Sequence, residues 1–454
     1  MYIICWLKGL HGGYTHANWL YSDNIIKNVT SFDFTSSYPY VLVSHKFPMS
    51  EFKKCNITDL DNMLPMFAYL IRIKLKNISS KQFNTFLSKD KCRNIKGGRY
   101  DNGRIIKADY LETTITDVDF NYLKLAYNFE YEVIEIYYSN YSYLPKELIL
   151  FILDKYVKKT QYKNVEGKEY EYSKEKSLFN SIYGMAVTNN IRADVIYDNT
   201  TGWREENITN EEIEKRLKKE KNDCFMSFAW GVWCTSYARS NLIKNIIKLD
   251  KFCIYGDTDS MKLKEGFDIN VINSYNEFVE NKLKHVAEKL DINYDLFAPE
   301  DKKGIKHLLG VFDLDGKYKE FKTQGAKKYA YIKEYKKEKI KDKTKVNVVK
   351  ENKDSYDVLE ITVSGVPKNG AFDLKTLDDF KDDLEFTFKN TNKNTIYYSE
   401  NQKEIELTDY LGNKTKVNDK SGCCLLPTTY KLSKALEYSY LLDSECTERA
   451  LYNE

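Results

Sequence analysis

Residues 255–260, which read Y-G-D-T-D-S, decide the fold that we expect for this chain. The residues before the glycine, 252–255, are apolar β-formers, and residues 261–263 read M-K-L. Two short strand-like runs around a polar turn predict a β-hairpin with acids at its tip. Because alternate residues of a strand share a face, Asp257 and Asp259 are expected to point the same way.

A second acidic segment lies near the N-terminus, where residues 33–39 read D-F-T-S-S-Y-P. Residues 32–34 predict a short strand, closed by a turn at residues 38–39. If this strand lies beside the hairpin, its Asp33 joins the two hairpin acids. Hard Mg²⁺ ions are held by a few carboxylates together with phosphate oxygens of a substrate. The three acids therefore predict metal-assisted phosphoryl chemistry with two Mg²⁺ ions, for which Mn²⁺ can substitute.

Residues 174–185 predict a helix that carries a cation. Ser173 suits the N-cap position, and the spacing of Lys176, Asn180 and Tyr183 places them on one face. A lysine on such a helix can bind the triphosphate of an incoming nucleotide. Alone, each motif has an ordinary explanation as a turn, a polar hairpin tip or a surface helix. Together, and in this order, they favour a catalytic site.

Length and composition set broad limits. A chain of 454 residues is long enough for two or three packed subdomains, and no apolar run is long enough to span a membrane. The nine cysteines show no C-x-x-C spacing, and the first residues lack the basic region of a signal peptide. We therefore expect free thiols and a cytoplasmic location.

The net charge of +3 gives no argument for nucleic-acid binding by itself. The distribution of charge is more informative, because residues 327–345 hold nine lysines against three acids. Such a run can follow a phosphate backbone, or it can be a solvated hairpin tip. Charge alone leaves both interpretations open.

The rest of the chain divides into insertions, helices and a β-rich end. Residues of about 50–135, with the strand-like residues 68–73, are interpreted as one insertion, and the polar residues 191–225 as a second. Periodicity and β-former content predict a helix beginning at residues 148–153, a solvated helix near 211–219, a core helix over 228–247, and strands from about 346 that end in a helix-like 432–442.

These motifs resemble those of the family B DNA polymerases, and the chain is most similar to the protein-primed polymerases of bacteriophages. Residues 33–39 match D-x-x-S-L-Y-P with Ser37 in place of Leu, and residues 176–184 match K-x-x-x-N-S-x-Y-G. Residues 255–260 match Y-x-D-T-D-S, and residues 327–329 match the K-x-Y element that contacts the primer terminus. The resemblance extends over essentially the whole chain.

A further match lies at residues 11–13, H-G-G, where the family has a Y-x-G-G linker between exonuclease and polymerase parts. Leu10 stands in place of the Tyr, which affects the linker's contact with template and not the catalytic site. The family's exonuclease precedes this linker, whereas eleven residues precede Gly12 here. We therefore expect polymerisation without proofreading by this chain, with the exonuclease lost or supplied as a separate subunit.

The resemblance implies an α+β fold, namely a right-hand polymerase with an antiparallel palm sheet, helical fingers, two insertions and a β-rich thumb. In the family the insertions enclose template and downstream strand, and the first also contacts the terminal protein. The implied subdomains are linker and N-terminal palm (1–50), first insertion, similar to the terminal-protein region (51–140), fingers (141–190), second insertion of the strand-displacement type (191–227), C-terminal palm (228–360) and thumb (361–454).

The resemblance also implies a role for each motif residue. Asp33 and Asp259 would be the main metal ligands, with Asp257 a third, more structural acid of the catalytic set. The implied nucleotide-binding residues are Ser36, Tyr38, Lys176, Asn180 and Tyr183, of which Tyr38 would reject a 2′-hydroxyl. The implied DNA- and primer-binding residues are Gly12, Gly13, Thr258, Lys327 and Tyr329. A second triphosphate-binding lysine is expected among Lys158, Lys159, Lys163 and Lys168, and the sequence does not choose between them.

The implied function is a template-directed DNA polymerase that adds deoxynucleotides to a primer 3′-hydroxyl, in protein-primed replication of a phage or mobile element. Its implied partners are template and primer DNA, deoxynucleoside triphosphates, a terminal protein and a separate exonuclease subunit, with no membrane. If a phage encodes the chain, its location is the cytoplasm of the host cell.

Three other functions are weighed against this one. An RNA-templated polymerase shares the palm and the acidic hairpin, but the complete motif at residues 176–184 argues against it. A non-catalytic DNA-binding or priming-complex subunit has no need for clustered acids, because like charges brought together without a metal are unfavourable. A metal-dependent nuclease would need a histidine-rich or D-x-E cluster in a suitable place, which this sequence does not offer, since the five histidines are scattered.

Overall fold

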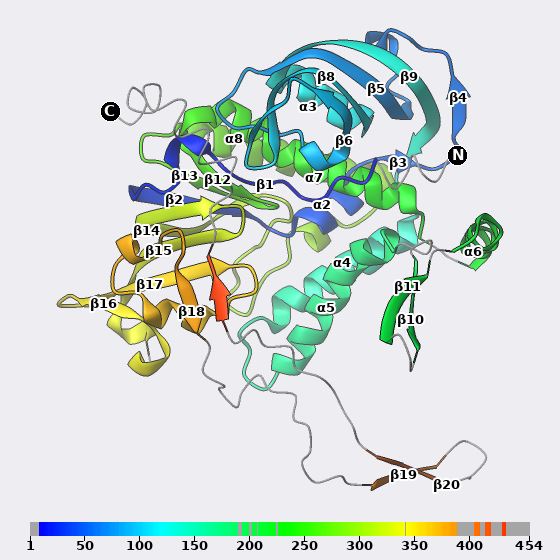
Figure 1. The fold of residues 1–454 in the computed structure, drawn as a ribbon. Coiled ribbons are helices and arrows are strands. Elements are labelled where there is room, and N and C mark those ends of the chain that lie inside the picture. The colour runs from blue at the N-terminus through cyan, green and yellow to red at the C-terminus, as the bar shows by residue number, and fades with distance from the viewer. Residues whose placement is uncertain are drawn as a thin grey trace. The chain divides into compact units, whose positions relative to one another are not determined.

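The computed structural model describes residues 9–188, 193–198, 202–206, 208–223, 226–340, 342–387, 404–408, 414–418 and 429–432. The chain forms two compact units (Figure 1). Unit 1 comprises Met1–Ser22, Ile26–Tyr318 and Ala435–Glu454, and unit 2 comprises Asp23–Ile25 and Lys319–Lys434. The helix predicted over 432–442 lies outside the described residues, apart from Leu432.

The central sheet of unit 1 contains the two acidic segments. Its antiparallel order is β1 (Thr15–Ala17), β12 (Cys253–Asp257), β13 (Ser260–Leu263), β2 (Ile26–Phe34) and then the first residues of β14 (Phe312–Gly325). Strands β12 and β13 form the predicted hairpin, and Asp257 pairs with Ser260 across it. On the other side of β13, Ser260 pairs with Asp33. The acidic strand and the acidic hairpin are therefore neighbours, as predicted.

Helices α2 (Ser37–Ser44), α7 (Phe228–Leu249) and α8 (Ile269–Leu290) pack together in unit 1. The predicted core helix over 228–247 corresponds to α7 and is confirmed. The turn predicted at residues 38–39 is wrong, because Pro39 lies in the first turn of α2. Proline is tolerated there, since the first N–H groups of a helix have no partner within the helix.

Two further helices, α4 (Lys146–Tyr162) and α5 (Glu169–Ala186), lie side by side (Figure 1). The predicted start of the second helix at Ser173 is wrong: α5 begins at Glu169, and Lys168 is its N-cap. The acids Glu169 and Glu171 occupy the first turn, where their negative charges interact favourably with the positive end of the helix dipole. This stabilises one more turn than the capping pattern predicted.

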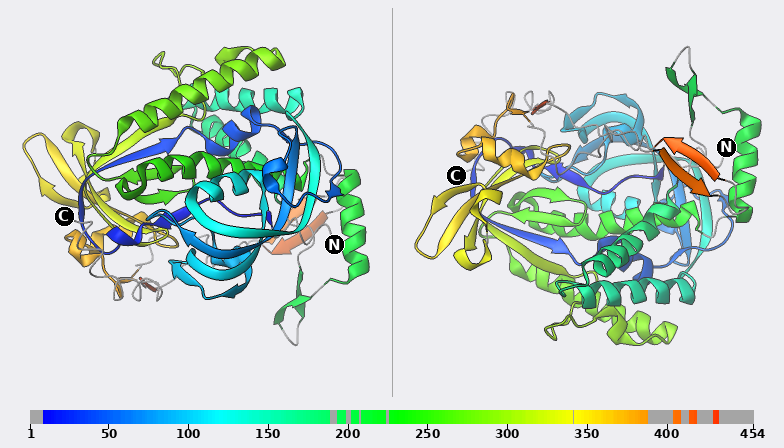
Figure 2. Two further views of the ribbon diagram at one scale, coloured as in Figure 1. Left: turned by 90° about the horizontal axis from the view of Figure 1, so that it is seen from above. Right: turned by 90° about the horizontal axis from the view of Figure 1, so that it is seen from below.

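A second antiparallel sheet in unit 1 curves around helix α3 (Asp117–Ala126), which packs between this sheet and α7 (Figures 1 and 2). The strand order is β3 (Phe47–Pro48), β9 (Tyr127–Ser142), β5 (Phe67–Ser80), β8 (Arg104–Thr116) and β6 (Cys92–Lys96), with β4 (Lys53–Cys55) paired to β9 and β7 (Arg99–Asp101) to β8. Unit 1 also contains the hairpin of β10 (Asp194–Asp198) and β11 (Gly202–Glu206), followed by the polar helix α6 (Asn210–Asp223).

Unit 2 is mostly antiparallel β-structure. The later part of β14 is followed in the sheet by β15 (Lys328–Lys336), β17 (Ser355–Val363) and β16 (Val348–Glu351). Among its described residues, unit 2 also contains two smaller sheets of two strands each. One pairs β18 (Glu385–Thr387) with β21 (Thr429–Lys431), and the other pairs β19 (Glu404–Thr408) with β20 (Lys414–Asn418). No helix in the described parts of either unit is long and apolar enough to cross a membrane.

Gly310 supplies a backbone position that the fold around α2 requires. Its φ is +84°, and a Cβ atom there would lie 2.2 Å from the ring of Tyr40. Its N–H also donates to the carbonyl of Thr35 at 2.8 Å, two residues after Asp33. A side chain at this position would therefore displace the segment that leads from β2 into α2.

We expect Gly310→Ala to lower the free energy of unfolding by about 2–4 kcal/mol, through left-handed backbone strain and overpacking against Tyr40. Gly304→Ala is the matched control, because Gly304 has a φ of +74° but no atom within 4 Å of a Cβ. The control isolates the backbone strain, of about 1–2 kcal/mol. Urea unfolding measures both variants, and equal losses would contradict the contact with Tyr40.

Candidate active site

A cleft of about 650 Å³ in unit 1 separates acidic from basic side chains. Four aspartates line it from the strand side, namely Asp33, Asp259, Asp313 and Asp315, and three lysines line it from the helix side, namely Lys159 of α4, Lys163 directly after α4 and Lys176 of α5. The carboxylates come from three separate segments, of which β2 and β14 are neighbours in the sheet. The cleft can therefore hold cations beside a polyphosphate.

The pairing of β2 with the hairpin brings Asp33 and Asp259 together. Phe34 N–H donates to the carbonyl of Asp259 at 2.7 Å, and Asp33 pairs with Ser260. Thr258 takes the left-handed conformation at the hairpin tip, with a φ of +58°. Both acids line the cleft. The principal juxtaposition expected from the sequence is thus present.

Asp257 has a different environment. Its Oδ1 accepts hydrogen bonds from Thr15 Oγ1 at 3.1 Å and from Thr258 Oγ1 at 3.3 Å, and it is not among the residues that line the cleft. The expectation that Asp257 and Asp259 share a face used strand alternation, which does not extend to Asp259, because this residue lies in the turn. Asp257 supports the hairpin, and Asp259 faces the cleft.

Burial and neighbouring carboxylates both act on Asp33. Burial and then the charge of Asp259 raise the pKa of Asp33 to about 7, with smaller contributions from Asp315 and Asp257. Lys262 acts in the opposite direction and is 4% exposed. Such a concentration of carboxylates favours a bound cation, because a cation would stabilise their ionised forms.

Lys262, Asp313 and Asp315 are site residues that the sequence reasoning missed. Lys262 Nζ donates to Ser31 Oγ at 2.8 Å, and Ser31 Oγ donates to Asp315 Oδ2 at 3.0 Å. Thr35 Oγ1 donates to Asp313 Oδ2 at 2.9 Å. The sequence contained a signal for Lys262, which is a lone lysine within an apolar strand. It also contained a signal for Asp313 and Asp315, which occupy alternate positions of a strand and so share one face.

The basic side of the cleft contains two of the four candidate lysines. Lys159 and Lys163 line the cleft, as does Lys176. Burial, Lys163 and Lys176 lower the pKa of Lys159 to about 8. Lys158 instead pairs with Asp154 at 2.9 Å, and Lys168 pairs with Glu171 at 2.7 Å. Three lysines are therefore positioned to bind an anion.

The other predicted nucleotide-binding residues lie in or next to the cleft. Ser36 accepts a hydrogen bond from Lys159 Nζ at 3.0 Å and has a φ of +63°, a strained conformation for a non-glycine residue. Asn180 lines the cleft. One turn along α5, the ring of Tyr183 stacks on that of Tyr38, with centroids 4.3 Å apart and 18° between the planes. This stack fixes the orientation of both rings.

The glycine linker lies against the hairpin tip. Thr258 N–H donates to the carbonyl of Tyr14 at 2.5 Å, and a Cβ atom on Gly13 would lie 2.7 Å from Thr258 Cγ2. Arg239 of α7 donates to the carbonyls of His11 and Gly12, the latter at 3.0 Å. Gly12, Gly13 and Thr258 are thus brought together in unit 1.

Lys327 and Tyr329 belong to unit 2. Lys327 is the last residue of the turn before β15 and has a φ of +58°, and its carbonyl accepts a hydrogen bond from Ser364 N–H at 3.0 Å. Tyr329 is 9% exposed, and its ring centroid lies 5.4 Å from that of Phe321. Both residues occupy ordered positions, and their contact with a primer stays a prediction.

The donor set of the cleft fits magnesium. In the described part of the chain, no three His, Cys, Asp or Glu side chains converge closely enough to hold an ion by themselves. Mg²⁺ is usually bound by one or two carboxylates, with water and substrate phosphate oxygens as the other ligands. Asp33 and Asp259, which line the cleft together with three lysines, match that pattern.

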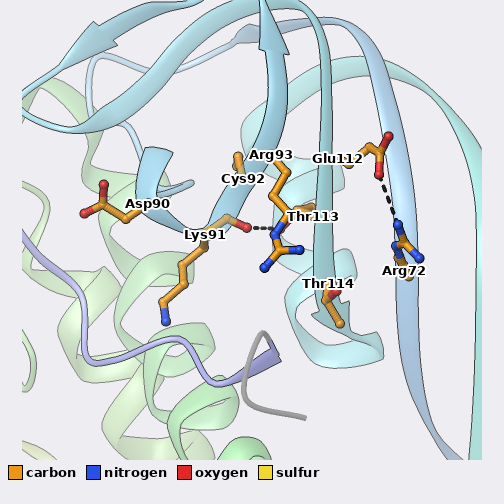
Figure 3. A pocket seen from close by; sticks show the side chains of 8 residues that line it. All are labelled: Arg72, Asp90, Lys91, Cys92, Arg93, Glu112, Thr113 and Thr114. Carbon is orange, nitrogen blue, oxygen red and sulfur yellow. Dashed lines mark hydrogen bonds and ion pairs between the residues drawn. The ribbon is translucent and has the colours of Figure 1, made fainter. Parts of the chain in front are cut away.

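A smaller cavity, of about 200 Å³, lies in the curved sheet and contains none of the predicted site residues (Figure 3). Arg72 pairs with Glu112 at 3.4 Å across its rim, and Thr113 Oγ1 donates to the carbonyl of Lys91 at 3.0 Å. Its charged groups thus include an internal ion pair. The larger cleft is the candidate active site.

Comparisons with known proteins identify the family and the fold of the chain. The family model described as DNA polymerase type B, organellar and viral, matches residues 7–249. Phi29 DNA polymerase complexed with primer-template DNA and incoming nucleotide substrates has a similar fold, with a TM-score of 0.58 and 19% identity over 94% of this chain and 62% of that chain. Its orthorhombic crystal form matches with a TM-score of 0.59 and 18% identity, over 95% and 63%.

The complex of Phi29 DNA polymerase with single-stranded DNA gives a TM-score of 0.57 and 17% identity, over 95% of this chain and 62% of that chain. The chain thus spans about 62% of the length of these solved structures, and at such identities the likeness concerns the fold. It confirms the expected mixed architecture with antiparallel sheets. No curated protein sequence matches the chain.

The raised pKa of Asp33 predicts a pH-dependent stability in the absence of divalent ions. Since the folded state holds this proton up to about pH 7 and the unfolded chain only to about 3.8, stability is lost as pH rises through that interval. In EDTA at pH 8, Asp33→Asn should therefore be more stable than the parent by about 1–2 kcal/mol, and the difference should vanish near pH 4.

Urea unfolding at both pH values measures this difference. Asp295→Asn is the control, because Asp295 is 72% exposed and lies outside the cleft. A stability difference for Asp33→Asn that is the same at pH 4 and pH 8 would contradict the charge coupling.

Proposed function

The chain belongs to the organellar and viral type B DNA polymerases, and from this we propose that it is a template-directed DNA polymerase. The proposed reaction adds a deoxynucleotide to the 3′-hydroxyl of a primer with release of pyrophosphate. The observation that carries the proposal is the cleft, which sets Asp33 and Asp259 opposite Lys159, Lys163 and Lys176. Phosphoryl transfer depends on positioning and on neutralising the charge of the transferring oxygens, and this arrangement provides both.

In the proposed mechanism Asp33 and Asp259 hold two Mg²⁺ ions, which when bound supply charge neutralisation at the reacting oxygens. Lys159, Lys163 and Lys176 bind the triphosphate and orient its α-phosphate toward the primer. Because burial, and then repulsion from Lys163 and Lys176, lower the pKa of Lys159 to about 8, an incoming polyanion should bind strongly and favour the protonated amine.

We further propose that Tyr38 selects the sugar. Its ring is held by the stack with Tyr183, so that a 2′-hydroxyl on a bound nucleotide would meet a rigid surface. Ser36 and Asn180 complete the nucleotide side of the cleft. Gly12, Gly13 and Thr258, which lie together at the hairpin tip, are proposed to approach the primer and template, along with Lys327 and Tyr329 of unit 2.

The subdomains of a right-hand polymerase are proposed as follows. The palm (1–50 and 228–360) would contain the acidic sheet with α7 and α8, and the fingers (141–190) would be α4 and α5. The first insertion (51–140) would be the curved sheet, the second (191–227) would contain β10, β11 and α6, and the thumb (361–454) would follow. Protein-primed replication of a phage or mobile element is the proposed setting, with a terminal protein as partner.

Primer extension on a DNA template by the purified chain tests the function. We expect extension with Mg²⁺ and deoxynucleotides, and Asp259→Ala should reduce its rate at least about 1,000-fold while DNA binding changes less than twofold, because a group acting on the reacting oxygens is lost. Asp295→Ala, an exposed acid outside the cleft, is the control and should retain the parent rate. Extension on RNA but not on DNA would favour the RNA-templated alternative, and wild-type extension by Asp259→Ala would refute the site.

Two adjacent lysines of α4 test the triphosphate assignment. Lys159→Ala should raise the KM for deoxynucleotides by about 10–100-fold, since a charge-assisted hydrogen bond is worth about 1.5–3 kcal/mol. Lys158→Ala is the matched control and should change KM less than about threefold, because its exposed pair with Asp154 contributes little. Steady-state single-nucleotide insertion measures both, and similar effects would show that the cleft lysine has no special role.

A further inference from the structure

A second cavity of unit 1, of about 500 Å³, is lined by α3, α7, α8 and the residue that follows α2. Lys244 and Lys248 of α7, His45 after α2 and Phe278 of α8 are among its lining residues, none of which lines the acidic cleft. Neutral side chains that can donate hydrogen bonds complete the wall, namely Asn121, Ser240, Asn241, Asn245 and Ser274.

The two lysines that line this cavity, and Lys282, which contacts the lining residue His45, are not paired with carboxylates among the described residues. Lys282 Nζ lies 2.6 Å from His45 Nε2, so that a lysine contacts a neutral base rather than a carboxylate. Within the described parts of the chain, no Asp or Glu forms an ion pair with Lys244, Lys248 or Lys282. Lys284, which is on α8 like Lys282, shows the usual arrangement and pairs with Glu280 at 2.6 Å.

Burial and neighbouring positive charges lower the pKa values of these lysines, as is typical of an anion-binding site. Burial and then Lys244 lower the pKa of Lys282 to about 7, and burial and Lys248 lower the pKa of Lys244. Asp117 is the carboxyl group of the lining, and burial raises its pKa to about 7 while Tyr141 and Trp233 donate hydrogen bonds to it. Near neutral pH Asp117 therefore compensates the charge of the lysines only in part.

Aromatic rings accompany these cations. Phe278 is 55% exposed, and Lys282 Nζ lies 6.0 Å from the centre of its ring. The ring of Tyr237 lies 4.2 Å from that of His45 on the opposite element. Proteins that bind nucleotides without reading their sequence combine lysines with exposed aromatic rings. The lysines contact phosphate oxygens, and the bases stack on the rings.

We propose that the cavity lined by Lys244, Lys248, His45 and Phe278 binds a phosphate group of a nucleotide or of a nucleic acid. This site is separate from the acidic cleft. The phosphate can belong to a free nucleotide or to a single DNA strand. An anion there offsets the repulsion between the lysines and satisfies the neighbouring amide and hydroxyl donors. The inference stands apart from the proposed polymerase activity, because none of its residues takes part in that mechanism.

The test is a titration followed at individual lysines, with the full chain labelled at the lysine ε-carbon and kept in EDTA. Inorganic pyrophosphate, deoxyadenosine monophosphate and a short oligothymidylate are the probes. We expect the signals of Lys244 and Lys248 to shift on binding and the pKa of Lys282 to rise from about 7. Tighter binding of the oligothymidylate would identify a DNA strand as the ligand, and tighter binding of the monophosphate or pyrophosphate would identify a free one.

Two variants localise the effect. Lys244→Gln/Lys248→Gln should weaken binding of the preferred probe at least tenfold. Lys284→Gln, which changes a lysine of α8 that does not line the cavity and is already paired with Glu280, should leave binding unchanged. The wild-type titration decides by itself if the double variant does not fold. Unshifted Lys244 and Lys248 signals with all three probes, or equal weakening by Lys284→Gln, would overturn the proposal; neither result depends on primer extension.

Affinity should also fall as pH rises from about 6.5 to 8.5, because Lys282 loses its proton over this range. The groups that face it act in the same direction or stay constant. Asp117, with a pKa of about 7, becomes negative, while His45 is already neutral because burial and Lys282 lower its pKa, and Lys244 loses charge only as pH increases. An affinity that increases with pH would contradict the site.

Discussion

The pairing of β2 with β13 is the constraint on which the rest of the site depends. It sets Asp33 opposite Ser260, and with it the distance from the N-terminal acid to the hairpin tip. Because strand side chains alternate, a slip of one residue would turn Asp33 away from the cleft. Burial prevents this slip: Phe34 stacks on Phe312 with centroids 3.9 Å apart and also contacts Tyr275 of α8.

The same register explains how so many charges are tolerated. Ser31 lies two residues before Asp33 on the same face of β2, opposite Lys262. Its hydroxyl links Lys262 to Asp315, so that a buried lysine has polar partners within an acidic wall. A single apolar substitution at Ser31 would remove both of these hydrogen bonds, and Lys262 would keep Ser260 Oγ and Asp315 would keep Tyr318 Oη as partners, so that buried polar groups lose part of their hydrogen bonding. Core packing and site electrostatics are therefore encoded in alternate residues of one strand.

Local patterns predicted much of this arrangement from the sequence. The turn chemistry of residues 255–260 identified the hairpin, and apolar periodicity identified α7. Helix boundaries were less predictable, since the acids before Ser173 extend α5, and Pro39 fits the first turn of a helix as well as a turn. Sequence could not choose between Lys158 and Lys159, because their environments depend on which face of α4 meets α2, a tertiary property.

The hairpin tip is also constrained from the side of the linker. Arg239 pairs with Asp119 of α3 at 2.7 Å, with both side chains buried, and donates to the linker carbonyls at His11 and Gly12. Removing one member of a buried pair leaves an uncompensated charge and costs about 3–5 kcal/mol. The pair thus joins α7, the curved sheet's helix and the segment that contacts Thr258. Thr258 directly precedes Asp259. A displacement of the linker would therefore be transmitted to the acidic cleft through one peptide bond. The linker is thus part of the structure that supports the site.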